Sequence, residues 1–314
     1  MNNWKNKTVI GDNLEVMKQL PSNCIDLIYC DILYGTGRDF GDYKDLTANR
    51  KEIENFYIPR IKEMHRLLKD TGSIYLQMDT RINHWMRCIM DDVFGYHRFL
   101  NEIRVKKRSN GINTPTSYFV KNSDVILFYS KSKTYTFNTQ YRPLSEETKK
   151  RYTLNIDGRK VQYQTLTMRG YNKIITLVFE GKEYTGPYAW TQETLDKKIA
   201  EGVKIRVNSI GDLTYALFLD ERKGVQYDDF WSQFTYATNL HLYKTQKPKS
   251  LLHHIIKASS NEGDIVADFF CGSGTTLAVA NELGRNFFGC DINPKAIEIT
   301  NSRIRPSLFS AIAV

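Results

Sequence analysis

The chain has 314 residues, of which 41% are hydrophobic and 25% charged, with a formal net charge of +9 at pH 7. This composition predicts a packed soluble core, and the absence of any apolar run of about 18 residues excludes a membrane span. No apolar leader follows the first methionine, so we expect a cytoplasmic protein. The five cysteines form no CxxC pair and no zinc-ligand spacing, which predicts reduced thiols and no metal site.

The two ends of the chain show alternating strand and helix patterns. Short apolar runs predict strands at Cys24–Cys30, Ser73–Met78, Asp124–Tyr129, Gly263–Phe270 and Asn286–Asp291. Helical spacing of apolar residues predicts helices over 50–69, 81–94, 248–260, 275–283 and 294–304, with a turn at 70–72. Strands that alternate with helices indicate an α/β fold with a doubly wound, mostly parallel sheet.

The middle of the chain differs in character and in charge. Residues 140–240 are rich in Tyr, Thr, Lys and Gly, with short alternating runs such as Lys173–Phe179, which predicts a smaller, irregular and partly β module. Residues 101–240 carry +7 of the net charge, and such a basic segment suits a polyanionic partner. Phosphate contacts are expected at Lys106, Lys107, Arg108 and Ser109, although a solvated charge run is the alternative. Weaker candidates are Arg142, Lys149, Lys150, Arg151 and Arg169.

A glycine loop lies between the predicted strand 263–270 and the helix that follows it. Its sequence is Asp268-Phe269-Phe270-Cys271-Gly272-Ser273-Gly274-Thr275-Thr276. Closely spaced glycines at this place let a ligand approach the backbone near the start of a helix. The next strand ends in Asp291, at about the distance where nucleotide-binding folds place an acid on the ribose hydroxyls.

The residues around this loop indicate which nucleotide-like ligand it binds. No lysine follows Gly274, as a phosphate-binding Walker loop would require, and Leu277 stands where a dinucleotide fingerprint has its third glycine. Asp268 would repel a pyrophosphate, whereas it favours the ammonium and sulfonium of S-adenosylmethionine. The loop therefore predicts S-adenosylmethionine as the cofactor.

A second motif, Asp31-Ile32-Leu33-Tyr34, directly follows the first predicted strand. An aspartate beside an exposed aromatic ring suits a nucleobase that has been flipped out of a duplex, because the ring stacks on the base and the carboxylate accepts amino hydrogens. By itself the pattern is common in proteins with other roles.

Together, these motifs resemble the β group of DNA amino-methyltransferases, whose signatures are Asp-Pro-Pro-Tyr and Phe-x-Gly-x-Gly. Phe270-Cys271-Gly272-Ser273-Gly274 matches the second signature fully, and the catalytic motif precedes the cofactor loop as in that group. Thr245-Gln246-Lys247-Pro248 and Gly11-Asp12-Asn13-Leu14-Glu15 also look like motifs of the group. The resemblance covers about 1–130 and 241–305. It implies a catalytic half at 1–130, a target-recognition insert at 131–240 and a cofactor-binding half at 241–314, in a Rossmann-like methyltransferase fold.

The resemblance also implies roles for individual residues. Asp31, the Ile32 carbonyl and Tyr34 would hold the target base. Asp291 would bind the cofactor ribose, Asp12 would lie near its adenine, and Lys247 would contact its carboxylate. The methionine end would be lined by Asp268, Phe269, Phe270, Gly272, Gly274 and Thr275. The loop Gly35–Gly41 is expected to be mobile and to close over the bound base or cofactor.

The chain departs from the group at Ile32 and Leu33, which replace two prolines and would make the turn less rigid. Asp at the first motif position goes with adenine N6 in this group, and Ser with cytosine N4, so site-specific methylation of adenine in double-stranded DNA is expected. The alternatives are cytosine N4, RNA adenine, a protein amide, or a catalytically impaired DNA-binding subunit. A separate restriction endonuclease and a homodimer are further partners that the group suggests, with an orphan methylase as the alternative.

Overall fold

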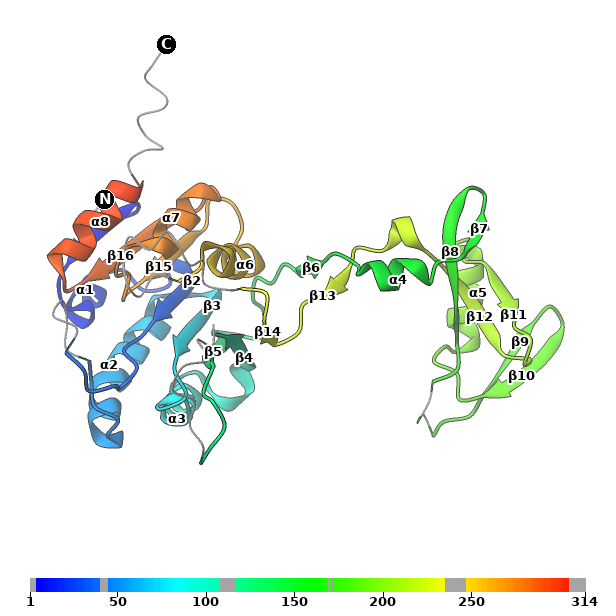
Figure 1. The fold of residues 1–314 in the computed structure, drawn as a ribbon, viewed down its shortest axis with the longest axis horizontal. Helices are drawn as coiled ribbons and strands as arrows, with labels where there is room; N and C mark the ends of the chain where they lie inside the picture. Colours follow the sequence, from blue (N-terminus) through cyan, green and yellow to red (C-terminus); the bar gives the residue numbers. More distant parts are fainter. Residues whose placement is uncertain are drawn as a thin grey trace, which may run out of the picture. The chain divides into compact units, whose positions relative to one another are not determined.

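The computed structural model describes residues 4–39, 45–107, 117–168, 170, 172–234 and 247–304. The chain divides into two compact units, one of Met1–Gln140 with Asp228–Val314 and one of Tyr141–Tyr227 (Figure 1). The second unit lies within the segment where the sequence predicts a target-recognition insert. No described helix has the length and apolarity that crossing a membrane requires.

The described part of the first unit is built on an eight-stranded sheet with the strand order β1-β16-β15-β2-β3-β5-β4-β14. The five strands from β1 to β3 in this order pair in parallel, whereas β5 is antiparallel to both β3 and β4. This arrangement confirms the predicted mostly parallel α/β sheet. The strands are β1 (Lys7–Ile10), β2 (Ile25–Asp31), β3 (Leu68–Met78), β4 (Phe99–Lys106), β5 (Ser123–Ser130), β14 (Phe230–Trp231), β15 (Ile265–Asp268) and β16 (Asn286–Asp291).

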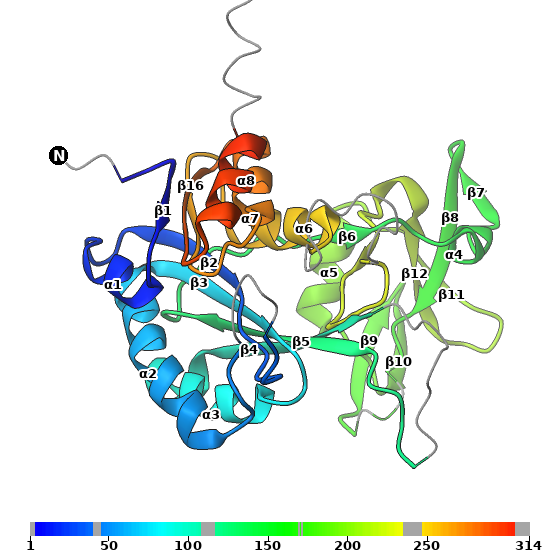
Figure 2. The ribbon, with the colours of Figure 1, turned by 60° about the vertical axis from the view of Figure 1, so that its left-hand side comes forward.

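Helices cover both faces of this sheet. In Figure 2, α1 (Asn13–Lys18), α2 (Arg50–Leu67) and α3 (Asn83–Phe94) lie on one side of it. The other side carries α6 (Lys249–Ser259), α7 (Thr275–Glu282) and α8 (Pro294–Ile304). Because both faces are covered, the central strands are mostly apolar, and β2 is buried from Ile25 to Cys30.

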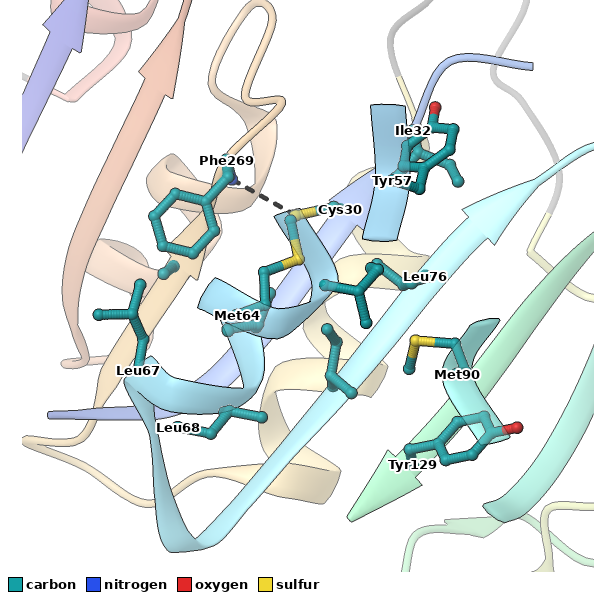
Figure 3. Close-up of a cluster of buried hydrophobic side chains, with 14 of the residues drawn as sticks. Cys30, Ile32, Tyr57, Met64, Leu67, Leu68, Leu76, Met90, Tyr129 and Phe269 are labelled. Carbon is teal, nitrogen blue, oxygen red and sulfur yellow. Dashed lines mark hydrogen bonds between the residues drawn. The ribbon is translucent and has the colours of Figure 1, made fainter. Parts of the chain in front are cut away.

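The longest helix, α2, shows why the sequence pattern predicts it. The Asn49 side chain caps its first turn by accepting from the main-chain N–H of Glu52 at 3.2 Å. Its apolar residues Ile53, Tyr57 and Met64 recur at helical spacing and are fully buried against the sheet. Figure 3 shows Tyr57 and Met64 in this core, with Cys30 from β2 and with Phe269, whose N–H donates to the Cys30 sulfur at 3.4 Å.

The sequence predicts that a turn at 70–72 separates a helix from a strand. This prediction is wrong, because β3 begins at Leu68 and runs through these residues. The pairing of β3 with β2 passes from Ile25–Leu68 to Leu27–Ser73, so that residues 69–72 bulge opposite Asp26. A Cβ atom on Gly72 would lie 2.9 Å from the Lys69 carbonyl oxygen, and glycine is therefore needed in this bulge.

The described part of the second unit contains short antiparallel sheets and two α-helices, which agrees with the partly β character of its sequence. Its four-stranded sheet has the order β11-β12-β8-β7, and β9 pairs with β10. Leu166, Leu177, Tyr188, Leu195 and Leu213 form its buried core. The elements are β6 (Tyr141–Arg142), α4 (Glu146–Lys150), β7 (Leu154–Ile156), β8 (Arg159–Thr165), β9 (Ile175–Phe179), β10 (Lys182–Gly186), α5 (Gln192–Ala200), β11 (Ile205–Val207), β12 (Leu213–Phe218) and β13 (Val225–Gln226).

Candidate active site

Three neighbouring strands end in aspartates at one edge of the sheet. Asp31 ends β2, Asp268 ends β15 and Asp291 ends β16, and these strands are adjacent and parallel. Their side chains line a cavity of about 660 Å³, a volume within the range of small-molecule sites. The predicted site residues that line this cavity are Asp12, Asp31, Ile32, Tyr34, Lys247, Asp268, Phe269, Phe270, Gly272, Thr275 and Asp291.

Gly274 is the one predicted cofactor residue that is not in the lining, and the structure gives it a packing role. It caps α7 with φ +72°, and a Cβ atom there would overlap the Thr300 side chain on α8. Gly272 also has positive φ, at +48°, but a Cβ atom would meet nothing within 4 Å. The Gly272 N–H donates to Asp291 at 2.8 Å, which ties the loop to β16.

Asp268 is a buried carboxylate at the base of the loop. It accepts hydrogen bonds from the Thr276 hydroxyl at 2.7 Å and from the Phe270 N–H at 3.0 Å. The pKa of Asp268 is raised to about 7, chiefly by burial; the two hydrogen bonds oppose the rise, and the nearby charges of Asp31 and Asp291 contribute to it. A bound cation would relieve this unfavourable burial and repulsion, so the site suits a positively charged ligand.

Both carboxylate oxygens of Asp31 have donors in the structure. The Tyr34 hydroxyl donates to Oδ1 at 2.7 Å, and the Lys247 ammonium donates to Oδ2. Burial raises the pKa of Asp31, while Lys247 and Tyr34 oppose that rise. Lys247 also lies 5.4 Å from the centre of the Tyr34 ring, so its side chain belongs to the catalytic turn as well as to the cavity.

Hydrogen bonds hold the turn where the family has two prolines. The Ile32 N–H donates to the Gln77 carbonyl at 3.0 Å, a bond that a proline could not make. The Tyr57 hydroxyl donates to the Leu33 carbonyl at 3.0 Å, and Figure 3 shows Tyr57 beside Ile32. Among the described residues, no group donates to the Ile32 carbonyl, which leaves it able to accept from a ligand.

The chain after the turn is anchored by Asp45, a buried residue that sequence reasoning missed. Asp45 accepts from the N–H groups of Gly35 and Thr36 at 3.1 and 2.8 Å, and from the Thr36 hydroxyl at 2.5 Å. Of the loop predicted to be mobile, Phe40 and Gly41 lie outside the described residues. Its mobility stays a prediction.

A second set of residues missed from the sequence connects the N-terminal motif to the cofactor loop. The buried Arg60 on α2 donates to Asp12 and to Asn13, both at 2.6 Å, and its guanidinium lies 3.7 Å from the centre of the Phe56 ring. Asn13 in turn donates to the Phe269 carbonyl at 2.9 Å. Asp12, which also caps α1 through the Leu14 N–H at 2.8 Å, is thereby held at the cavity wall.

The candidate phosphate contacts have different surroundings. Lys106 is exposed at the end of β4, whereas Lys107 donates to the buried Asp124 at 2.6 Å. Arg108 and Ser109 lie outside the described residues, as does Arg169. Lys149 and Lys150 lie on α4, followed by Arg151, and Arg142 lies on β6.

Fold and site together define an α/β protein with a small-molecule cavity at the carboxyl edge of its sheet. A family model of DNA methylases, covering N6 and N4 enzymes, matches residues 25–302. The chain therefore belongs to this DNA methylase family, as its motifs predicted.

Known relatives agree with this assignment. The chain is 31% identical to the type II methyltransferase M.EcaI of Enterobacter cloacae over 84% of its own length and 61% of that enzyme. It thus spans about 61% of this relative. It is 27% identical to the DNA adenine methyltransferase YhdJ of Escherichia coli strain K12, over 95% of this chain and 82% of that protein.

A solved structure shares the fold. It is TTHA0409 from Thermus thermophilus, a putative DNA modification methylase complexed with S-adenosylmethionine. It matches with a TM-score of 0.51 at 14% identity, and the match covers 97% of this chain and 95% of that one. The family match and the S-adenosylmethionine complex of this structural neighbour support the cofactor predicted from the glycine loop.

Proposed function

We propose that this chain methylates the N6 amino group of adenine in double-stranded DNA. The observation that carries the proposal is the position of Asp31 and Tyr34, which line the same cavity as the glycine loop and Asp268. A base stacked on Tyr34 would therefore lie beside the cofactor site. Such proximity and alignment of two reactants is a large part of what a methyltransferase has to provide.

The cofactor supplies a methyl group activated by its sulfonium centre. The cavity fits this ligand in charge, because Asp12, Asp31, Asp268 and Asp291 line it with Lys247 as the one lysine among its lining residues. Around the methionine end we place Asp268, Phe269, Phe270, Gly272 and Thr275, with Gly274 shaping the loop. We assign Asp291 to the ribose, Asp12 to the adenine side, and Lys247 to the cofactor carboxylate, since its ammonium has further hydrogens besides the one donated to Asp31.

The chain's own contribution to the chemistry is to hold the target amine. Tyr34 stacks on the flipped adenine, while Asp31 and the Ile32 carbonyl accept the two N6 hydrogens. Acceptors on both hydrogens draw the nitrogen lone pair out of conjugation with the ring, and the nitrogen then becomes the nucleophile. The pairing with Lys247 favours the ionised form of Asp31, which this role requires.

Adenine is favoured over cytosine by the aspartate at position 31, since the group's cytosine-N4 enzymes usually have serine there. The similarity to a protein named as a DNA adenine methyltransferase supports the same choice. Cytosine N4 is the second candidate, because the family includes both kinds of enzyme.

The test is methyl transfer from a tritiated donor to duplex DNA, followed by digestion and mass spectrometry of the nucleosides. We expect N6-methyladenine, and Asp31→Ala should lower its formation by at least about 100-fold while cofactor binding is kept. If the product is N4-methylcytosine, the function is the second candidate, methylation of cytosine N4. DNA binding without any methyl transfer would instead make the chain an impaired DNA-binding subunit.

We also propose that the chain works beside a separate restriction endonuclease and as a homodimer, as the resemblance suggests. Methylome sequencing of a host that expresses the protein would define the recognition site. Protection of that site against a co-encoded nuclease would support the restriction role, whereas methylation without such a nuclease would indicate an orphan methylase. Sedimentation of the protein with and without DNA measures its molecular mass and so shows whether it is a dimer.

A further inference from the structure

The proposed function requires an acceptor that the structure shows to be engaged. Asp31 has to accept a hydrogen from the target amine, yet Tyr34 donates to its Oδ1 and Lys247 to its Oδ2. Each carboxylate oxygen offers two lone-pair sites, so the amine can share an oxygen with one of these donors, but its own hydrogen bond is strongest if one of the two donors turns away. The structure contains features that decide which one.

Lys247 is the more costly donor to displace. The Lys247 and Asp31 side chains are only 10% and 23% exposed, so separating them leaves a largely buried charge without its partner. The loss of one member of a buried ion pair is strongly destabilising. Tyr34, by contrast, donates a neutral hydroxyl, and moving its hydrogen bond to another carboxylate replaces one bond by a similar one.

A second carboxylate is in place to receive that bond. Asp124, the second residue of β5, has its Oδ2 3.3 Å from the Tyr34 hydroxyl, already within hydrogen-bond reach. The Asp124 side chain is 2% exposed. It is held by the Gln77 amide at 3.1 Å and by the Lys107 ammonium at 2.6 Å. Gln77 itself accepts from the Tyr29 hydroxyl at 2.7 Å, so the acceptor is fixed on several sides.

We propose that Asp124 is a positioning residue that takes over the Tyr34 hydroxyl when the target amine binds Asp31. This inference rests on the proposed function. The hydroxyl hydrogen turns from Asp31 Oδ1 to Asp124 Oδ2, and Oδ1 then accepts the amine hydrogen. The Tyr34 ring stays in place for stacking, because only the direction of its O–H bond and a small displacement of its oxygen are needed.

We call this transfer of the Tyr34 hydroxyl from Asp31 to Asp124 the relay. It predicts that one substitution rescues another. Asp124→Ala removes the acceptor to which the hydroxyl would turn, so that the hydroxyl competes with the amine for Asp31. In Tyr34→Phe the competitor is gone, although the ring remains. Tyr34→Phe should therefore restore amine recognition to Asp124→Ala, which a purely structural role of Asp124 would not allow.

The experiment measures the affinity for duplexes that carry either adenine or purine, which lacks the amino group, at the target position. We expect Asp124→Ala to lower the adenine-to-purine affinity ratio by about tenfold or more. The double variant Tyr34→Phe/Asp124→Ala should stay within about twofold of the ratio of Tyr34→Phe alone and above that of Asp124→Ala. Asp124→Asn keeps one acceptor oxygen and should fall between Asp124→Ala and the wild type.

Cofactor binding and thermal melting show whether each variant is folded, and Asp124→Asn takes the place of Asp124→Ala if the latter does not fold. A double variant as poor as Asp124→Ala would overturn the relay, and so would an unchanged ratio in Asp124→Ala. A wild-type protein with no preference for the amine-bearing base would overturn the proposed function too. A wild-type preference without rescue would overturn the relay alone.

Discussion

The Lys247 ammonium is paired with the Asp31 carboxylate, although 216 positions separate the two residues along the chain. Lys247 precedes α6 and Asp31 ends β2, so the pair joins the two halves of the first unit at the active-site edge of the sheet. The pair also favours the ionised form of Asp31, because burial raises the pKa of that carboxyl and Lys247 is the largest influence that lowers it.

Lys247→Met should therefore make methyl transfer more dependent on pH. Without the ammonium the pKa of Asp31 rises further, and the carboxyl becomes protonated as the pH falls. We expect kcat/KM of Lys247→Met to fall more steeply than that of the wild type as the pH is lowered and to recover in part as the pH is raised, since one unit of pKa corresponds to a tenfold change. Lys247→Arg, which keeps the charge, is the control. Parallel pH profiles for wild type and Lys247→Met would contradict this role.

Cofactor binding should depend on the ionisation of Asp268. Its pKa is raised to about 7, so the carboxyl is protonated below that pH in the free protein and ionised above it. A cationic ligand favours the ionised form of Asp268, so the affinity for the cofactor should rise as the pH increases from about 6 to 8. Near pH 7, binding of the cofactor should release a proton. Calorimetry in buffers of different ionisation enthalpy measures the released proton. Asp268→Asn should bind more weakly and show no such release.

Restoring the family's proline at position 32 should destabilise this protein. Ile32→Pro removes the N–H that donates to the Gln77 carbonyl at 3.0 Å, and it also removes a buried side chain. We expect a loss of about 1–3 kcal/mol in the free energy of unfolding, measured by denaturant titration. Leu33→Pro is the matched control, because no N–H bond of Leu33 to another described residue is lost there. Equal stability of Ile32→Pro and wild type would show that the hydrogen bond contributes little.

The two glycines of the cofactor loop should respond differently to the same substitution. Both have positive φ, so alanine strains the backbone at either position by about 1 kcal/mol. At Gly274 the added Cβ also overlaps Thr300, whereas at Gly272 it meets nothing within 4 Å. Gly274→Ala should therefore lower the melting temperature more than Gly272→Ala, and Thr300→Ala should recover part of that difference. A larger loss for Gly272→Ala would mean that loop strain, not packing on α8, dominates.

Lys106 and Lys107 should differ in their contribution to DNA binding. Lys106 is exposed, and a contact with a phosphate would add about one unit to the slope of log affinity against log salt. Lys107 is already paired with Asp124 at 2.6 Å. We expect Lys106→Gln to reduce the salt slope and Lys107→Gln to leave it nearly unchanged. The reverse result would place Lys107 on the DNA backbone.

The sequence alone determined the features that depend on neighbours along the chain. Continuous apolar runs identify β2, β15 and β16 because these strands are buried on both faces, and helical spacing identifies α2 and α8. The glycine loop and the aspartates at strand ends follow from local motifs. Strand β4 was missed because its two faces differ in burial and its residues Asn101, Glu102 and Arg104 interrupt the apolar pattern.

Only the tertiary structure decided which polar groups meet at the site. Asp45 carries no motif, and it acts on the loop that folds back over it. Arg60, Gln77 and Asp124 carry no motif either, and each acts on residues that the sheet and its helices bring close from another part of the chain. The same holds for Lys247, whose motif indicated a cofactor contact but whose ammonium lies on Asp31. Local patterns report backbone propensity and burial, whereas a buried charge takes its partner from whatever donors or acceptors the folded chain places beside it.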